Sequence, residues 1–354
     1  MLKSKFMSKK FLFALILLSI IGAGIIAFII IKNRTLPIVS KVADNQILFP
    51  TLSNDQKYIF YFSNANEAAF YRLELQNQKI EKISEDFDTP DRIIWSPSKN
   101  QAILQVTYNK YIFEKYGSPF IRPGVDDQAI TFWLYDLNQK KLSPLDLNIR
   151  DIIWSKDGQK IVSSYYDEEL NHNIINISDP DGTNLENLIK NELPIEKVIS
   201  YEPANKKLIF GASTPGELES RLDIYQVIGS GTPTLIIEAV EPGGIYASSN
   251  MEHLVSIIDG VLNISNLTQN KTQSLKIKTN KNLTVWLNDN QNLIVATRQE
   301  TTKTDTFYKI NSQTLKKNMI NHKGTVDIQN LILSSDQKTL YFTSDDILYK
   351  LELK

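Results

Sequence analysis

The sequence contains no cysteine among its 354 residues. Disulfide bridges, thiolate metal sites and a cysteine nucleophile are therefore excluded together. Histidine is scarce as well, and the three residues of this type are His172, His253 and His322. A histidine metal site or acid–base site needs several converging groups, and no spacing pairs these three. We therefore expect isolated surface imidazoles, no bound metal and no cofactor.

Acidic residues are absent from the first 35 positions, which hold six of the 39 Lys and Arg residues. The remainder carries 33 basic residues against 40 acidic ones, a net charge of about −7. A negatively charged surface repels phosphate backbones, so we expect no nucleic-acid partner.

Long uncharged runs are missing after Ile31, but residues 11–31 form one. About 20 apolar residues suffice to cross a bilayer as a helix. Four lysines precede the run, which predicts a cytoplasmic N-terminus (1–10), a transmembrane signal anchor (11–31), a short linker (32–35) and an extracytoplasmic domain (36–354). A cleaved signal peptide is the alternative, but seven apolar residues beyond the small residues 22–24 favour a retained anchor.

A short sequence motif occurs seven times. It consists of an apolar or aromatic residue, here called the anchor, followed by a polar turn and an apolar strand. The anchors are Leu52, Trp95, Trp154, Tyr201, Ala247, Trp286 and Leu333. Their spacing of 39 to 59 residues brackets the period of a four-stranded propeller blade. The residue seven positions after each anchor is apolar every time, so we predict one structural unit that is reused, with length changes confined to loops.

Each repeat is predicted to hold four short strands, and the third repeat shows them at 151–155, 160–166, 172–178 and 184–190. The sequence ends after the third strand of the seventh repeat, while residues 36–44 resemble a fourth strand without a blade. We therefore predict an all-β propeller of seven four-stranded blades, rather than six or eight, in which the N-terminal strand completes the last blade.

The motif that begins at Trp154, together with the turn at residues 179–182, resembles the repeat of TolB-like propellers, which are relatives of WD-repeat proteins. The repeats that begin at Trp95 and Leu333 carry the resemblance less strongly. It implies an exported bacterial propeller that binds proteins or envelope components, and it supplies no catalytic residues.

Groups that could carry chemistry are few. Acidic clusters at 126–127, 167–169 and 345–346 occupy predicted hairpins, where solvated acids are ordinary. Residues 179–184 faintly resemble a calcium loop but lack its bidentate glutamate, so we predict a plain turn. Trp95, Trp154 and Trp286 fall on the repeat register, which indicates packing between blades rather than a ligand cage. Trp133 lies in a predicted third strand and is expected to be buried as well.

One predicted loop is unusually long and rich in aromatic residues. It spans residues 108–128 in the second blade, and its candidate partner-binding residues are Tyr108, Tyr111, Phe113, Tyr116, Phe120 and Arg122. Tyr, Phe and Arg are enriched at recognition surfaces, and long loops often carry specificity. The alternative is a loop that folds back and caps its own blade.

Two functions follow as hypotheses. The first is a membrane-anchored, extracytoplasmic, non-enzymatic protein-binding or scaffold module of the bacterial cell envelope. It rests on the repeat, the anchor and the absence of a recognisable catalytic motif. The alternative is a carboxylate-dependent glycan-processing hydrolase or lyase on a propeller scaffold. Convergence of two or more acidic side chains and a basic one at the mouth of the central channel would favour the enzyme.

Overall fold

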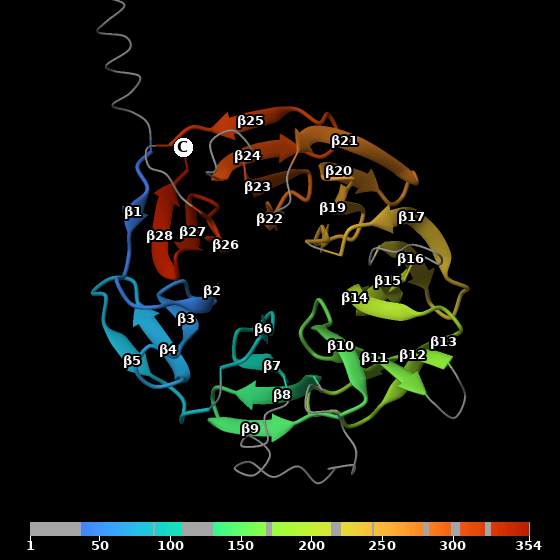
Figure 1. The fold of residues 1–354 in the computed structure, drawn as a ribbon, viewed down its shortest axis with the longest axis horizontal. Helices are drawn as coiled ribbons and strands as arrows, with labels where there is room; N and C mark the ends of the chain where they lie inside the picture. The colour runs from blue at the N-terminus through green and yellow to red at the C-terminus, as the bar shows by residue number, and fades with distance from the viewer. Residues whose placement is uncertain are drawn as a thin grey trace, which may run out of the picture.

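The computed structural model contains seven four-stranded antiparallel sheets arranged in a ring around a central axis (Figure 1). It describes residues 37–87, 89–107, 130–167, 172–213, 221–242, 244–278, 283–298, 305–322 and 327–353. In this part of the chain the one helical element is a single 3-10 turn, Pro203–Asn205. The predicted all-β propeller of seven blades is confirmed.

The first three blades follow in chain order, each from its inner to its outer strand: β2 (Leu48–Leu52), β3 (Tyr58–Ser63), β4 (Ala69–Glu74) and β5 (Ile80–Lys82); β6 (Arg92–Trp95), β7 (Gln101–Thr107), β8 (Ile130–Asp136) and β9 (Lys141–Pro144); β10 (Ile149–Trp154), β11 (Ile161–Asp167), β12 (His172–Ser178) and β13 (Glu186–Asn191).

The next three blades have the same order: β14 (Ile195–Glu202), β15 (Lys207–Ser213), β16 (Leu222–Ile228) and β17 (Thr234–Val240); β18 (Tyr246–Ala247), β19 (His253–Ile258), β20 (Val261–Asn266) and β21 (Lys271–Lys278); β22 (Leu283–Trp286), β23 (Asn292–Arg298), β24 (Asp305–Asn311) and β25 (Lys317–Ile320). Blade 7 combines β26 (Asn330–Leu333), β27 (Thr339–Ser344) and β28 (Ile347–Glu352) with β1 (Ser40–Lys41).

The constant offset of seven residues has a direct structural cause. Each anchor lies at the end of an inner strand, or one residue before it in β14, and the residue seven positions later is its cross-strand partner in the second strand. The pairs are Leu52–Ile59, Trp95–Ala102, Trp154–Ile161, Tyr201–Leu208, Ala247–Leu254, Trp286–Leu293 and Leu333–Leu340. The turn between the two strands therefore keeps one length around the ring.

These turns also explain why the repeat is faint in sequence. In six of them the fourth residue after the anchor has a positive φ, a conformation that favours glycine. Only Gly158 meets that preference, whereas the other five are Gln56, Lys99, Met251, Asn290 and Gln337. Blade 4 uses the 3-10 turn instead. The backbone geometry is thus repeated more faithfully than the residues that form it.

The N-terminal strand closes the ring, as predicted. β1 pairs antiparallel with β28, and the Val42 amide donates to the Leu348 carbonyl at 2.8 Å. Val42 itself is buried between blades 7 and 1. The predicted strand covered 36–44, whereas regular pairing is confined to the two residues of β1.

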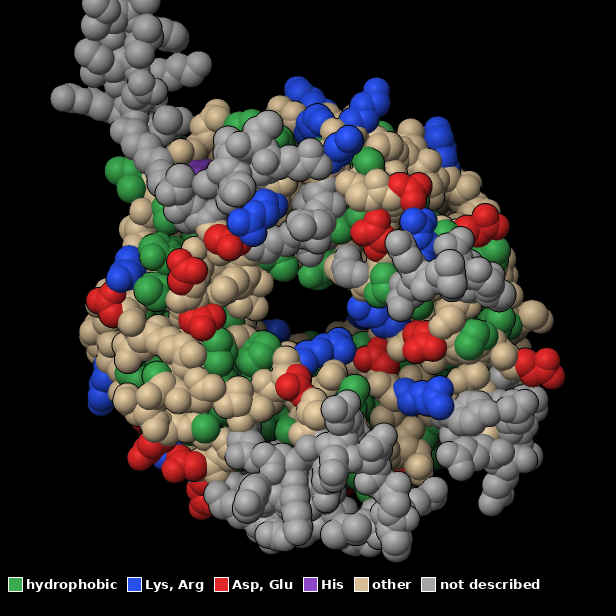
Figure 2. Space-filling view, in the orientation of Figure 1, with side chains coloured by type: hydrophobic (Ala, Val, Ile, Leu, Met, Phe, Trp, Pro, Cys, Tyr) green, Lys and Arg blue, Asp and Glu red, His purple; other side chains and the backbone are tan. Residues whose placement is uncertain are grey.

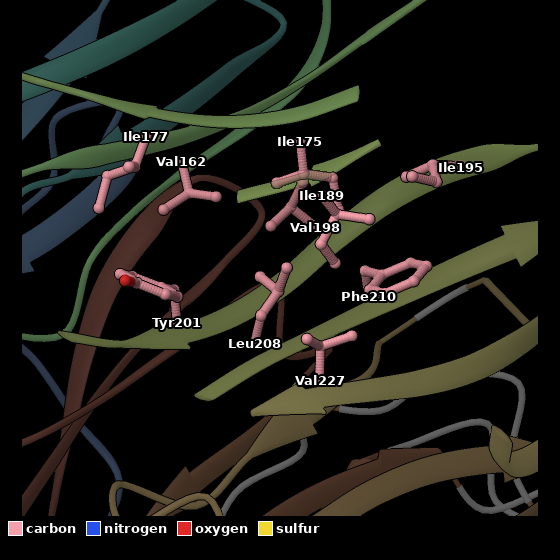
Figure 3. Packing of buried hydrophobic residues seen from close by; sticks show 10 residues of the cluster. All are labelled: Val162, Ile175, Ile177, Ile189, Ile195, Val198, Tyr201, Leu208, Phe210 and Val227. Carbon is pink, nitrogen blue, oxygen red and sulfur yellow. The ribbon is translucent and has the colours of Figure 1, made fainter. Parts of the chain in front are cut away.

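The core lies between the blades, where the faces of neighbouring sheets meet. Figure 3 shows one such layer, in which aliphatic side chains of blade 3 interdigitate with Tyr201, Leu208 and Phe210 of blade 4. The tryptophans belong to these layers, because the Trp154 Nε1 donates to the Ile94 carbonyl of blade 2 at 2.9 Å. Trp95 reaches the Phe49 carbonyl of blade 1 in the same way. Their predicted packing role is confirmed.

The predicted anchor, residues 11–31, lies outside the described residues. No helix within the described ranges is both long and apolar enough to cross a membrane. The membrane span therefore stays a prediction.

Candidate functional site

The inner strands of the seven blades surround a central opening. Figure 2 shows that Lys and Arg side chains gather around this opening on the viewed face. To compare the blades, we number the residue pairs between inner and second strand from the anchor, which belongs to pair 1. Side chains alternate along a strand, so those of pairs 2 and 4 lie on the same side of the blade.

At pair 4, three consecutive blades carry ionisable side chains. Arg92 of β6 is paired with Gln105, Asp151 of β10 with Ser164, and Lys197 of β14 with Gly211. The corresponding inner-strand residues of blades 1, 6 and 7 are Leu48, Leu283 and Asn330. Arg92, Asp151 and Lys197 thus form a charged arc along one side of the ring, and this name is kept below.

Hydrogen bonds link the charged arc from blade to blade. Arg92 Nη1 donates to Asp151 Oδ1 at 3.1 Å, and Asp151 Oδ2 accepts the Val198 amide of blade 4 at 2.8 Å. Lys197 Nζ donates to the Pro242 carbonyl, ahead of β18, at 3.3 Å. Asp151 is 6% exposed, whereas the Arg92 side chain is 40% exposed. Asp151 therefore holds the Arg92 guanidinium in place, and the exposed part of the guanidinium can donate hydrogen bonds to a bound molecule.

The arc changes the acidity of its own lysine. Burial lowers the pKa of Lys197, the Arg92 charge lowers it further, and Asp151 offsets part of the effect. Burial raises the pKa of Asp151, with Arg92 and the Val198 amide acting in the opposite direction. A lysine with a lowered pKa has a larger neutral fraction near pH 7, which lets it act as a general base.

Pair 2 is two residues nearer to the anchor than pair 4, and it is apolar on four inner strands, where it holds Ile94, Ile153, Val285 and Ile332. The other three blades carry a hydroxyl group at this pair, from Thr51, Ser200 and Tyr246. Burial raises the pKa of the Tyr246 hydroxyl, and the Arg92 charge counteracts this from blade 2, so the two side chains interact electrostatically. Pair 2 thus carries no charged side chain, whereas pair 4 carries ionisable side chains on three neighbouring blades.

The sequence reasoning did not identify Arg92, Asp151 or Lys197. A signal was present, because Arg92 and Asp151 each precede the tryptophan anchor of their blade by three residues. Lys197 precedes its anchor, Tyr201, by four. A register shift between Val198 and Ser200 brings it to the same pair.

The other groups considered from the sequence remain apart. His172, His253 and His322 belong to blades 3, 5 and 6, and His253 is buried rather than on the surface. The described ranges contain no group of three or more His, Cys, Asp or Glu side chains able to hold a metal ion. The turn at 179–184 is internally satisfied, because Lys160 Nζ donates to Asp179 at 2.7 Å and Asn184 donates to the same carboxylate at 2.5 Å.

Of the three acidic clusters, one is fully described, one partly and one not at all. Asp345 and Asp346 have positive φ angles in the tight turn between β27 and β28, which accounts for their residue type. Asp167 ends β11, whereas residues 126–127 and 168–169 lie outside the described ranges. The same holds for the long loop and its six candidate residues, from Tyr108 to Arg122, so that interface stays untested.

Comparison with known proteins identifies the fold. No protein-family model matches the chain, and no curated protein matches it either. Among solved structures, it is similar to an oligogalacturonate lyase in complex with manganese and to an oligogalacturonate lyase from Vibrio parahaemolyticus. For each, the identity is 11%, the TM-score is 0.62, and the match covers 89% of this chain and 93% of the other. At this identity the likeness establishes the propeller fold, while the TolB-like assignment has no support from a family model.

The comparisons nevertheless contradict our main functional hypothesis. Both matched propellers are enzymes, which runs against the expectation of a non-enzymatic binding or scaffold module. The charged arc meets the criterion set for an enzyme in part, because it brings one acidic and two basic side chains to one level of the ring. The non-enzymatic expectation is therefore wrong, and the glycan-processing alternative is taken up below as a proposal. The manganese of the first match has no counterpart among the described residues, which lack a suitable ligand group, so no step below uses a metal.

Proposed function

We propose that this protein is a lyase that cleaves uronate-containing glycans at the charged arc. The observation that carries the proposal is the placement of Arg92, Asp151 and Lys197 at one level of the ring on three adjacent blades. The likeness to two oligogalacturonate lyases supports the reaction class by analogy of fold.

Elimination from a uronate requires two catalytic functions. A base must remove the proton on the carbon beside the carboxyl group, and a cation must stabilise the negative charge that then develops on the carboxyl oxygens. Lys197 has the lowered pKa that suits the first task. Arg92 is half exposed and always charged, which suits the second.

Asp151 acts on this proposal as a positioning residue. Its two oxygens accept hydrogen bonds from Arg92 and from the Val198 amide, so the carboxylate fixes the guanidinium at the level of the ring that Lys197 also occupies. Its charge also limits how far the pKa of Lys197 falls.

The arc favours elimination over hydrolysis. Glycoside hydrolysis in its usual form needs two carboxyl groups on opposite sides of the scissile bond. The charged arc holds one carboxylate, which is hydrogen-bonded through both oxygens, and two cations. This composition matches the requirements of proton abstraction beside an anionic group better than those of an acid pair.

The experiment is a spectroscopic assay with the full-length chain in detergent. Elimination creates a carbon–carbon double bond conjugated to the carboxyl group, so ultraviolet absorbance should rise with oligogalacturonate and not with a neutral glucan. Lys197→Met should abolish the rise, whereas the control Lys190→Met, on the outer strand β13, should leave it unchanged. Equal rates in both variants, or no rise with any uronate glycan, would refute the proposal.

A further inference from the structure

We infer that one face of the propeller rests on the surface of the lipid bilayer, so that the charged arc opens away from the membrane. We call this surface the turn face, because it carries the turns that follow the seven anchors. The inference rests on the predicted membrane span, residues 11–31, and is independent of the lyase assignment.

The direction of the strands decides which residues lie on the turn face. Every inner strand ends there, and neighbouring strands of each blade are antiparallel. The third strand of a blade therefore ends at the turn face too, and the outer strand begins there. In blade 7 the outer strand is β1, which pairs antiparallel with the third strand, β28, so β1 also begins at this face.

The described chain enters the domain at the turn face. Ile38 lies just before β1, and it is 63% exposed. Only residues 32–37 separate it from Ile31, the last residue of the predicted span. Since an extended chain advances at most about 3.6 Å per residue, Ile38 lies within about 25 Å of the end of that span. The span therefore keeps this edge of the turn face close to the bilayer.

Exposed apolar side chains concentrate on the same face. Leu185 directly precedes the outer strand β13, Ile228 ends the third strand β16, and Leu235 is the second residue of the outer strand β17. All three are strongly exposed and share the turn face with Ile38. Two more large apolar side chains are exposed in the described ranges, Ile130 at the opposite face and Met319 within the outer strand β25.

These side chains lie on opposite sides of the ring. Blades 3 and 4 carry Leu185, Ile228 and Leu235, and they lie across the ring from blade 7, which Ile38 precedes (Figure 1). A partner that covers both groups must extend over the whole turn face. A flat bilayer does so, and it buries exposed aliphatic side chains at its interface.

The turn of blade 4 is suited to such an interface. Residues 229–233 carry no charged side chain, and the exposed Ile228 and Leu235 flank them. A Cβ atom added at Gly229 would meet nothing within 4 Å, so this turn projects from the domain. Arg92, in contrast, begins the inner strand β6 and lies at the opposite face. The charged arc is thus accessible to a glycan outside the membrane.

The absence of cysteine allows a test with single-cysteine variants of the full-length chain. Ile228→Cys, Leu185→Cys and the control Ile130→Cys are labelled with an environment-sensitive fluorophore and reconstituted in phosphatidylcholine vesicles, with and without a nitroxide on the lipid headgroup. Ile130 is a matched control, because it is 45% exposed against 58% for Ile228. The labels at Ile228→Cys and Leu185→Cys should shift to shorter wavelength and lose most of their emission to the nitroxide, and the control should do neither.

The outcomes separate the claims. If the chain floats with the vesicles and the two turn-face labels are quenched no more than the control, the docking of this face is refuted. If the chain does not float with the vesicles, the predicted span and the docking fall together. Neither result touches the lyase assignment, which the ultraviolet assay tests on its own.

Discussion

At the scale of single residues, two tryptophans on the same register position differ in one contact. The Trp154 Nε1 donates to the Ile94 carbonyl at 2.9 Å, whereas the Trp286 Nε1 is buried and has no hydrogen-bond partner among the described residues. Both indole rings therefore pack against apolar side chains, but only that of Trp154 also forms a hydrogen bond between blades.

This difference makes a matched pair of variants informative. Trp154→Phe removes a hydrogen bond as well as volume, whereas Trp286→Phe removes volume and relieves an unpaired donor. We predict that the first change lowers the free energy of unfolding by about 1 kcal/mol more than the second. Urea denaturation of both variants checks this, and equal losses would show that the indole hydrogen bond contributes nothing.

The charges of the arc predict opposite shifts in a pH profile. The acidic limb of kcat/KM should report the pKa of Lys197, because only the neutral amine accepts a proton. Asp151 raises that pKa and Arg92 lowers it. Asp151→Asn should therefore move the limb to lower pH, and Arg92→Gln should move it to higher pH. Shifts in the same direction, or a limb that stays in place, would mean that Lys197 is not the titrating base.

At the scale of elements, the closing strand is short for the task it performs. β1 contributes two residues to the sheet of blade 7, and the adjacent Val42 adds an amide hydrogen bond and a buried side chain. Burying a valine stabilises the fold by about 1.5–3 kcal/mol. Each hydrogen bond adds about 1 kcal/mol.

Removal of this strand should therefore open the ring. We predict that a chain lacking residues 1–44 loses roughly 3–5 kcal/mol of stability and melts roughly 5–10 °C lower than a chain lacking residues 1–36. Differential scanning calorimetry of the two truncations makes the comparison. Identical melting temperatures would show that the outer strand of blade 7 is dispensable for closure.

The sequence predicts these elements well because a blade repeats local rules. The offset of seven follows from a turn of constant length, so an apolar residue at that offset marks a strand pair without knowledge of the fold. The third strand of blade 3 was predicted at 172–178 and is observed at His172–Ser178. Alternation and β-branched residues suffice for such an assignment.

The charged arc could not be found in this way. Lys197 reaches pair 4 only because the register shifts between Val198 and Ser200, and counting three residues back from Tyr201 gives Val198 instead. A bulge depends on how two strands pair, so it can shift a side chain by one position along its strand. The repeat pattern of the sequence does not show such a shift.

At the scale of the whole molecule, the propeller gathers residues from distant parts of the sequence at one opening. Arg92 and Asp151 are 59 positions apart and hydrogen-bonded. The ring achieves this because equivalent strand positions of all blades meet around the axis, so one residue per blade suffices to assemble a site.

The predicted anchor adds an orientation to this arrangement. With four lysines before residues 11–31, we predict that the propeller lies outside the cytoplasmic membrane. Protease added to intact spheroplasts should digest the domain and spare a cytoplasmic control protein. Complete protection of the domain, under conditions that digest a known exported protein, would place it in the cytoplasm.

The most direct test of the lyase assignment is the fate of oxygen during cleavage. Oligogalacturonate is incubated with the full-length chain in oxygen-labelled water, and the products are examined by mass spectrometry. Elimination consumes no water, so we predict an unsaturated, unlabelled product that is absent with Lys197→Met and present with Lys190→Met. Saturated products that carry the label would show hydrolysis and contradict the account.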